Sequence, residues 1–301
     1  MRHAYARGVD NRQEVREFLM SRRARITPEQ AGMPAGANRR VPGLRRSEVA
    51  ALADVSVEYY SKLERGALAG VSAGVLDAIA RTLRLDDAER AYLFDLARAA
   101  DGTSAITRPR RKARQWTPRP SLQWALNAVT QGPAFVRNGR MDLLAANQLA
   151  RAFYADVYAD PQRPANLARF NFLDDNSRRF YPDWDLMADV SVAILRTEAG
   201  RDPHDKALHD LIGELCTRSS EFRTRWAANN VRHHGAGTKN FHHHVVGDLS
   251  LAYEGLEMVA DPSLTLTIYT AEPASPSEER LRLLASWAAT QQTESAASSA
   301  R

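Results

Sequence analysis

Residues 44–66 read LRRSEVAALADVSVEYYSKLERG, and this stretch decides the fold of the first third of the chain. The spacing of its apolar residues predicts a short helix over 45–53, a turn, and a second helix over 57–65. Ala50 is small enough for the two helices to cross closely, and the hydroxyl of Ser56 is placed to accept a hydrogen bond from a free amide of the second helix. The stretch therefore predicts a helix-turn-helix.

The second of these helices carries most of the residues that would read DNA. Val55, Tyr60 and Leu63 share the inward face at helical spacing, so the other positions face the major groove. Lys62 can donate to guanine or phosphate, and Glu58 can accept from cytosine. Serine-capped helical hairpins also occur in other small bundles, so a plain bundle stays the alternative at this point. The candidate DNA-binding residues are Arg46, Ser56, Val57, Glu58, Tyr59, Ser61, Lys62 and Arg65.

Three more helices complete an all-α, five-helix bundle. They are predicted over 11–25, 72–83 and 86–100. Ser72 and Asp86 are placed to cap the last two. A loop rich in glycine and proline precedes the helix-turn-helix and contains Arg39 and Arg40. These arginines either approach the DNA backbone or minor groove, or stay solvated.

Charge is distributed unevenly along the 301 residues, whose net charge is +5. Residues 1–100 carry +4, residues 101–120 carry +5, and residues 121–301 carry −4. A basic N-terminal part is typical of a protein surface that binds a polyanion. A solvated surface followed by a basic linker would give the same distribution of charge along the chain. The predicted division is a DNA-binding domain over 1–102, a basic linker over 103–120, a second domain over 121–290 and a disordered tail over 291–301.

Composition is that of an ordinary globular protein, with 44% apolar and 26% charged residues. It excludes collagen-like, coiled-coil and wholly disordered chains. No apolar run is long enough for a membrane span, and the first residues lack the apolar stretch of a signal peptide, so we expect a cytoplasmic protein without a membrane partner. The only cysteine, Cys216, excludes an internal disulfide, and its apolar surroundings in the sequence predict a buried, inert thiol.

The second domain mixes helices and strands, so the chain as a whole is predicted to be α+β. Asn138 and Gly139 form a strong hairpin-turn signal between the first two strands. Strands are predicted over 134–137, 142–145, 240–246, 249–258 and 264–271. Helices are predicted over 147–157, 183–197, 204–217, 220–229 and 277–290.

Longer stretches carry a resemblance to a known family. VSVEYYSKLERG, followed by VLDAIARTLRLDDAERAYLFDLA, resembles the Xre/Cro-type helix-turn-helix of MmyB-like bacterial transcription regulators. RRARITPEQAGMPAGANRRVPGLRRSEVAALA looks like the long first loop of that family. FRTRWAANNV, GTKNFHHHVVGDLSLAYEGLEM and LTIYTAEP look like its C-terminal domain. The resemblance strengthens the interpretation as a DNA-binding protein and implies a PAS-like α+β ligand-binding domain with fatty acids as the ligand class.

Aromatic residues are frequent in the second domain, as an apolar pocket requires, although most aromatics at element ends belong to a core. An acidic lipophile also needs a positive or donor group in its pocket. Arg196, Arg223 and Arg225 are candidates for that group, with exposed helix arginines as the alternative. The predicted ligand-binding residues are Tyr154, Trp184, Arg223, Trp226 and Tyr269.

Five of the eight histidines lie between His233 and His244. His242 and His244 would share one face of a strand, where a third ligand would complete a metal site, but partly exposed strand histidines are the stronger interpretation. Two departures from the family pattern fall in or beside this stretch, because Asn229 stands where a histidine is expected and His244 where a proline is expected. No metal is predicted.

The leading hypothesis is a transcription regulator that binds double-stranded operator DNA as a homodimer, because one helix-turn-helix reads only half a site. A small lipophilic ligand of the fatty-acid class would bind the second domain. The alternative is a second domain that docks another protein without a small ligand. An enzyme is disfavoured because the sequence lacks a glycine-flanked nucleophilic serine, an HExxH helix, a phosphate-binding glycine loop and a cysteine signature. No catalytic residue and no cofactor are predicted.

Overall fold

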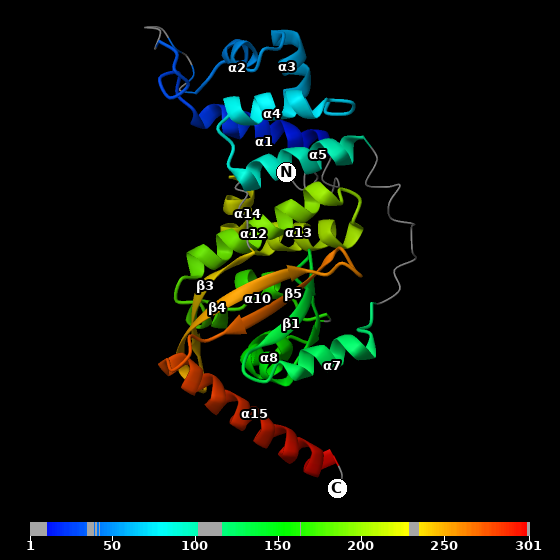
Figure 1. Ribbon diagram of the computed structural model, residues 1–301, viewed down its shortest axis with the longest axis vertical. Coiled ribbons are helices and arrows are strands. Elements are labelled where there is room, and N and C mark those ends of the chain that lie inside the picture. The colour runs from blue at the N-terminus through cyan, green and yellow to red at the C-terminus, as the bar shows by residue number, and fades with distance from the viewer. Residues whose placement is uncertain are drawn as a thin grey trace. The chain divides into compact units, whose positions relative to one another are not determined.

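The structure is a computed structural model that describes residues 11–34, 39, 41, 43–101, 116–162, 164–228 and 235–299, with side chains described up to residue 291. The chain divides into two compact units. The first unit combines residues 1–112 with residues 195–233, and the second combines residues 113–194 with residues 234–301. Figure 1 shows both units, with most of their helices and strands labelled.

Five helices form the N-terminal part of the first unit, as predicted. They are α1 (Asn11–Arg25), α2 (Arg46–Leu52), α3 (Val57–Glu64), α4 (Ala73–Thr82) and α5 (Asp87–Ala100). All three predicted caps are confirmed, because Ser56 accepts from the amide of Tyr59, Ser72 from that of Val75, and Asp86 from that of Glu89. Their common core contains Phe18, Val49, Tyr60, Leu63, Ile79 and Leu93.

The first unit also contains helices from the C-terminal half of the sequence. They are the end of α12 (Trp184–Arg201), α13 (Lys206–Arg218) and α14 (Ser220–Ala227). One face of α13 is an apolar stripe that is buried and consists of Leu208, Leu211, Ile212 and Leu215. Since α12 continues from Ile194 into Leu195, this helix belongs to both units.

The second unit is built on one antiparallel sheet of five strands (Figure 1). The strands are β1 (Ala134–Asn138), β2 (Leu143–Ala146), β3 (Ala236–His243), β4 (Gly247–Glu257) and β5 (Leu264–Thr270). Their order is β2-β1-β5-β4-β3. The predicted hairpin is confirmed, because β1 pairs antiparallel with β2. The chain is therefore an α+β protein with an N-terminal helix-turn-helix region.

Alternation along the strands gives the sheet two different faces. Val136 of β1 and Leu264 of β5 pack with Leu126 of α7 on one face. The side chains of Phe135 and Tyr269 point to the opposite face of the sheet, where they line a cavity. The helices of this unit are α7 (Pro120–Ala128), α8 (Gln148–Phe153), α9 (Ala155–Ala159), α10 (Leu167–Leu173), α11 (Asn176–Phe180), the first part of α12, and α15 (Pro276–Ser299).

Several boundaries differ from the predictions. The helix predicted over 147–157 is interrupted at Tyr154, whose backbone (φ −104°, ψ 33°) leaves the helical region between α8 and α9. Strand β3 ends at His243, so His244 lies in a turn and not on the predicted strand. The disordered tail predicted from residue 291 is helical up to Ser299, because alanine, glutamine and glutamate form helices without an apolar stripe.

Among the described residues, no helix combines the length and the apolar character that crossing a membrane requires.

Candidate functional site

Helix α3 presents the predicted DNA-binding residues on its outer side. Tyr60 and Leu63 are buried in the core of the first unit, as predicted. Val57 is 40% exposed and Tyr59 is 36% exposed, so both side chains are accessible on the outer side of α3. Ser56, Glu58, Lys62 and Arg65 are also exposed, whereas Ser61 is half-buried. The helix-turn-helix therefore leaves most of the predicted contacts accessible to the major groove.

Glu64 holds this helix-turn-helix together. Its carboxylate is 1% exposed and accepts from Arg23 of α1 at 2.8 Å and from Arg46 of α2 at 2.5 Å. A buried carboxylate needs such partners, because an unpaired charge is costly away from water. Arg46 remains half-exposed, at 49%, so the side chain predicted to contact phosphate also ties α2 to α3. The sequence analysis missed Glu64, which lies at an inward helical position next to Leu63.

Arg39 is held against the protein by an ion pair. Its guanidinium donates to both carboxylate oxygens of Glu48, at 2.7 and 2.8 Å, and to the carbonyl of Gly43 at 2.9 Å. The hydrogen bonds from Arg39 lower the pKa of Glu48 to about 2. The ion pair fixes the end of the loop at the start of α2. Arg40, the other arginine of this loop, lies outside the described residues.

The second unit contains a cavity between the sheet and helices α10 and α12. Its empty volume is about 530 Å³, which includes space open to solvent. Phe135, Tyr154, Leu167 and Ile194 are among its apolar and aromatic walls. Its polar lining consists of Arg137, Asn171, Ser191, Lys239 and Thr267, together with the tyrosine hydroxyls. No aspartate or glutamate lines the cavity among the described residues.

Lys239 brings an amine into these aromatic walls. It lies on the edge strand β3 and keeps some exposure as a residue, but its Nζ lies 4.3 Å from the ring centre of Tyr253 and 3.3 Å from the hydroxyl of Tyr269. Desolvation by burial, and then the charge of Arg137, lower the pKa of Lys239 to about 7. The cavity therefore holds an amine that changes charge near neutral pH.

Tyrosine hydroxyls continue the polar lining from this amine. The hydroxyl of Tyr154 donates to that of Tyr269 at 3.2 Å. Burial raises the pKa of Tyr269 to about 12, and it raises the pKa of Tyr154 well above its usual value. Both phenols therefore stay neutral at physiological pH, and Tyr269, which accepts from Tyr154, keeps its own proton to donate to a ligand.

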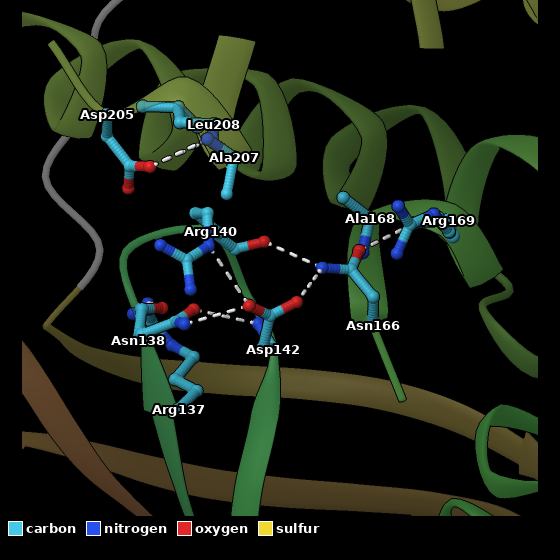
Figure 2. A network of polar contacts seen from close by, with 10 residues as sticks. All are labelled: Arg137, Asn138, Arg140, Asp142, Asn166, Ala168, Arg169, Asp205, Ala207 and Leu208. Atoms are coloured by element: carbon cyan, nitrogen blue, oxygen red, sulfur yellow. Dashed lines mark hydrogen bonds and ion pairs between the residues drawn. The ribbon is translucent and has the colours of Figure 1, made fainter. Parts of the chain in front are cut away.

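A network of buried polar groups fixes one part of the cavity wall (Figure 2). Asp142 accepts from the amide of Asn138 at 2.8 Å and from that of Asn166 at 2.7 Å. Asn166 also donates to the carbonyl of Arg140 and caps α10. These bonds join the β1–β2 turn to α10. They place Met141, which follows Arg140, and Leu167, which follows Asn166, in the cavity lining.

Two of the five predicted ligand-binding residues line this cavity, namely Tyr154 and Tyr269. Trp184 instead donates from its indole Nε1 to the carbonyl of Asn171 at 3.0 Å, and the guanidinium of Arg178 lies 3.7 Å from its ring centre. Trp184 was predicted to bind the ligand, whereas its ring is buried outside the lining and holds the backbone of Asn171, which is part of the lining.

Arg223 and Trp226 belong to the first unit and are not among the residues that line the cavity. Arg223 donates to the carbonyl of Cys216 at 3.0 Å. Trp226 stacks on Phe222 with ring centres 5.6 Å apart. Arg196, another candidate for the anion-binding group, is fully buried and its guanidinium lies 4.1 Å from the ring centre of Trp226. Cys216 is buried, as predicted, and burial raises the pKa of its thiol.

Lys239 and Arg137 are the cationic residues that the ligand prediction missed. A signal for Lys239 was present in the sequence, because residues 239, 241 and 243 share one face of a strand and Phe241 and His243 are buried there. A lysine on such a face is placed toward the core.

The described histidines do not form a metal site, and no cluster of three metal-binding side chains occurs among the described residues. His242 lies 2.6 Å from Asp248 on the exposed side of β3. His243 is buried, with its Nε2 3.3 Å from the carbonyl of Ala152. Asn229, His233 and His234 lie outside the described part of the chain.

Comparison with known proteins finds a matching family model for the helix-turn-helix region and for the region that contains the cavity. A family model described as the MmyB-like transcription regulator ligand binding domain matches residues 118–284, and a helix-turn-helix domain model matches residues 16–93. A search of curated proteins finds no match to the chain. The first range contains every residue that lines the cavity, and the second contains every candidate DNA-binding residue.

Proposed function

The chain belongs to the MmyB-like transcription regulators and is a DNA-binding regulator with a ligand-binding domain, and we propose that its effector is a lipophilic acid of the fatty-acid class. The polar part of the cavity carries this proposal. Lys239 and Arg137 supply positive charge there, neutral tyrosine hydroxyls supply donors, and no described lining residue is acidic. A carboxylate removed from water needs such partners, whereas an alkyl chain needs only the apolar walls.

The same proposal includes a homodimer as the form that binds operator DNA. One helix-turn-helix contacts a half-site, and two half-sites about one helical turn apart give the usual affinity of such regulators. The effector changes the affinity for DNA only if it stabilises one arrangement of the protein more than another.

We also propose that the cavity binds a ligand without transforming it. Its serine, Ser191, donates its hydroxyl to the carbonyl of Met187, so this oxygen is engaged within α12. No histidine lines the cavity among the described residues, and the hydroxyl of Ser191 bonds to Met187 and Asn171, so it is not paired with the Lys239 amine as a base.

Calorimetric titration of the full-length protein with dodecanoic acid and with its methyl ester tests the proposal. The acid should bind, and the ester should bind much more weakly because it cannot accept charge-assisted hydrogen bonds. The Lys239→Met variant should lose about 1.5–3 kcal/mol of the binding free energy for the acid. Lys206→Met, a change at an 86% exposed lysine, is the matched control and should bind as the unaltered protein does.

Equal binding of acid and ester, with Lys239→Met unaffected, would overturn the acidic effector. Absence of binding by either compound would favour a second domain that docks another protein.

A further inference from the structure

Among the lysines that the structure describes, Lys239 differs from the others in its surroundings. The chain has only four lysines, namely Lys62, Lys112, Lys206 and Lys239. Lys62 is exposed, and Lys206 pairs with Asp210 at 2.6 Å on the surface. Lys239 contacts the rings of Tyr253 and Tyr269 instead, and no described carboxylate forms an ion pair with it. Lys112 lies outside the described residues.

These surroundings change the chemistry of the amine. With the pKa of Lys239 at about 7, about half of its amine is neutral at neutral pH. An ordinary lysine with a pKa near 10.4 has roughly one neutral amine in a few thousand at pH 7. Only the neutral amine has a free electron pair, so desolvation beside another cation makes a lysine a nucleophile toward carbonyl compounds.

We infer that Lys239 captures an aliphatic aldehyde in the cavity as a reversible imine. The inference rests on the proposed role of this cavity as the effector site, and it adds a second, covalent class of ligand to the acids. The apolar walls formed by Leu167, Met187, Val190 and Ile194 suit the alkyl chain of either class. An acid and an aldehyde of the same chain length then differ only in how their head group meets Lys239.

The reaction needs no further reactant. The Nζ electron pair of Lys239 attacks the carbonyl carbon, and a proton passes from nitrogen to oxygen to give a carbinolamine. The carbinolamine hydroxyl then takes a proton from the Tyr269 hydroxyl and leaves as water while the carbon–nitrogen double bond forms, and the second proton of the nitrogen passes to the Tyr269 oxygen. Tyr269, whose hydroxyl lies 3.3 Å from Nζ, is a neutral phenol placed to donate to the departing oxygen, and Tyr154 donates to Tyr269 in turn. Addition of water reverses each step.

The surroundings also favour the product. An imine nitrogen is less basic than an amine nitrogen, so the adduct stays uncharged in a cavity that lacks an acidic partner and contains Arg137.

The test uses full-length protein, decanal as the probe and sodium borohydride, which is added after a set time of exposure and reduces a neutral imine to a stable secondary amine. Peptide mapping by mass spectrometry then reports the adduct at each lysine and at the terminal amine. At pH 7 the adduct should form on Lys239 faster than on Lys62 or Lys206. Its rate should rise with pH and level off just above pH 7, whereas labelling of Lys206 should keep rising to higher pH. Lys239→Met should lose this fast adduct, and Lys206→Met should keep it.

Equal labelling of Lys239 and Lys206, or labelling confined to the surface lysines and the terminal amine, would overturn the inference. Because the unaltered protein carries the decisive readout, the result does not depend on the folding of a variant. Binding of dodecanoic acid without an adduct on Lys239 would refute the imine alone. A fast adduct without acid binding would refute the acidic effector and leave the imine in place.

Discussion

Arg196 and Glu14 form a buried ion pair, although 182 residues separate them in the chain. The Arg196 side chain is 0% exposed and that of Glu14 is 4% exposed. The hydroxyl of Tyr92 donates to the same carboxylate at 2.6 Å, and Arg196 also donates to the carbonyl of Trp226. Within the first unit, this network joins the end of α12 to α1, α5 and α14.

Breaking this pair should destabilise the first unit strongly. Arg196→Met leaves the Glu14 carboxylate buried without its cationic partner, and such losses cost about 3–5 kcal/mol. Urea unfolding followed by circular dichroism measures the change. Arg90→Met is the matched control, because Arg90 pairs with Asp77 on the surface, where ion pairs contribute up to about 1 kcal/mol. Equal effects of the two substitutions would contradict the assigned role of Arg196.

Lys62 should contribute to the choice of operator sequence. If it reads a base, Lys62→Ala should weaken DNA binding by about 1–3 kcal/mol and relax the preference at one position of the site. Titration against DNA flanking the gene for this protein, at several salt concentrations, measures both effects. Lys206→Ala removes a lysine from the surface of α13 and should leave the preference unchanged. Unchanged affinity and preference for Lys62→Ala would remove Lys62 from the set of base-reading residues.

Asp54 should limit the stability of the helix-turn-helix. It lies in the turn between α2 and α3 with a φ of 54°, a left-handed conformation that glycine adopts without steric cost. Asp54→Gly should raise the free energy of unfolding by about 0.5–1 kcal/mol, less than for bulkier residues because aspartate tolerates this region better than most. Ala51→Gly, at the exposed last position but one of α2, should lower it by up to about 1 kcal/mol. A loss of stability on Asp54→Gly would show that the aspartate side chain stabilises the turn.

His243 should make the second unit less stable at mildly acidic pH. Its Nδ1 accepts from the amide of Val245, so the neutral ring is the form that fits. Desolvation lowers the pKa of His243, and the nearby Ala152 carbonyl, His244, Asp156 and His242 act on it less strongly. Below a pH of about 6.5 the unfolded chain therefore binds a proton that the folded chain does not, and stability falls by up to about 1.4 kcal/mol per pH unit.

Urea unfolding between pH 8 and 5 measures this slope. His243→Gln should flatten it, whereas His204→Gln, at an exposed histidine, should not. A slope that is the same in both variants would assign the pH dependence to other groups.

The helix-turn-helix was predictable from sequence because its determinants are local. Ser56, Ser72 and Asp86 each act on an amide three residues away, and the inward positions of α3 follow from helical spacing. Four of the five strand positions were predictable for the same reason, since alternation extends over only a few residues, whereas β3 begins four residues before the predicted position 240.

The cavity was not predictable in the same way because its lining comes from distant segments. Tyr154 and Tyr269 meet across 115 positions of the chain, and neither carries a local signal for that contact. Trp226 was assigned to the ligand on its residue type alone, yet it packs on Phe222 and Arg196. For Glu14 and Arg196, nothing near either residue indicates the other, because long-range pairing depends on how helices pack.

The Asp142 network at the β1–β2 turn bears on how tightly the cavity can hold a ligand. Asn138, Asp142 and Asn166 are each less than 10% exposed and are bonded to one another. The neighbouring walls at Met141 and Leu167 thus lose their conformational freedom when the chain folds. A ligand that enters later does not have to order this part of the wall, so that entropic penalty is absent from its affinity.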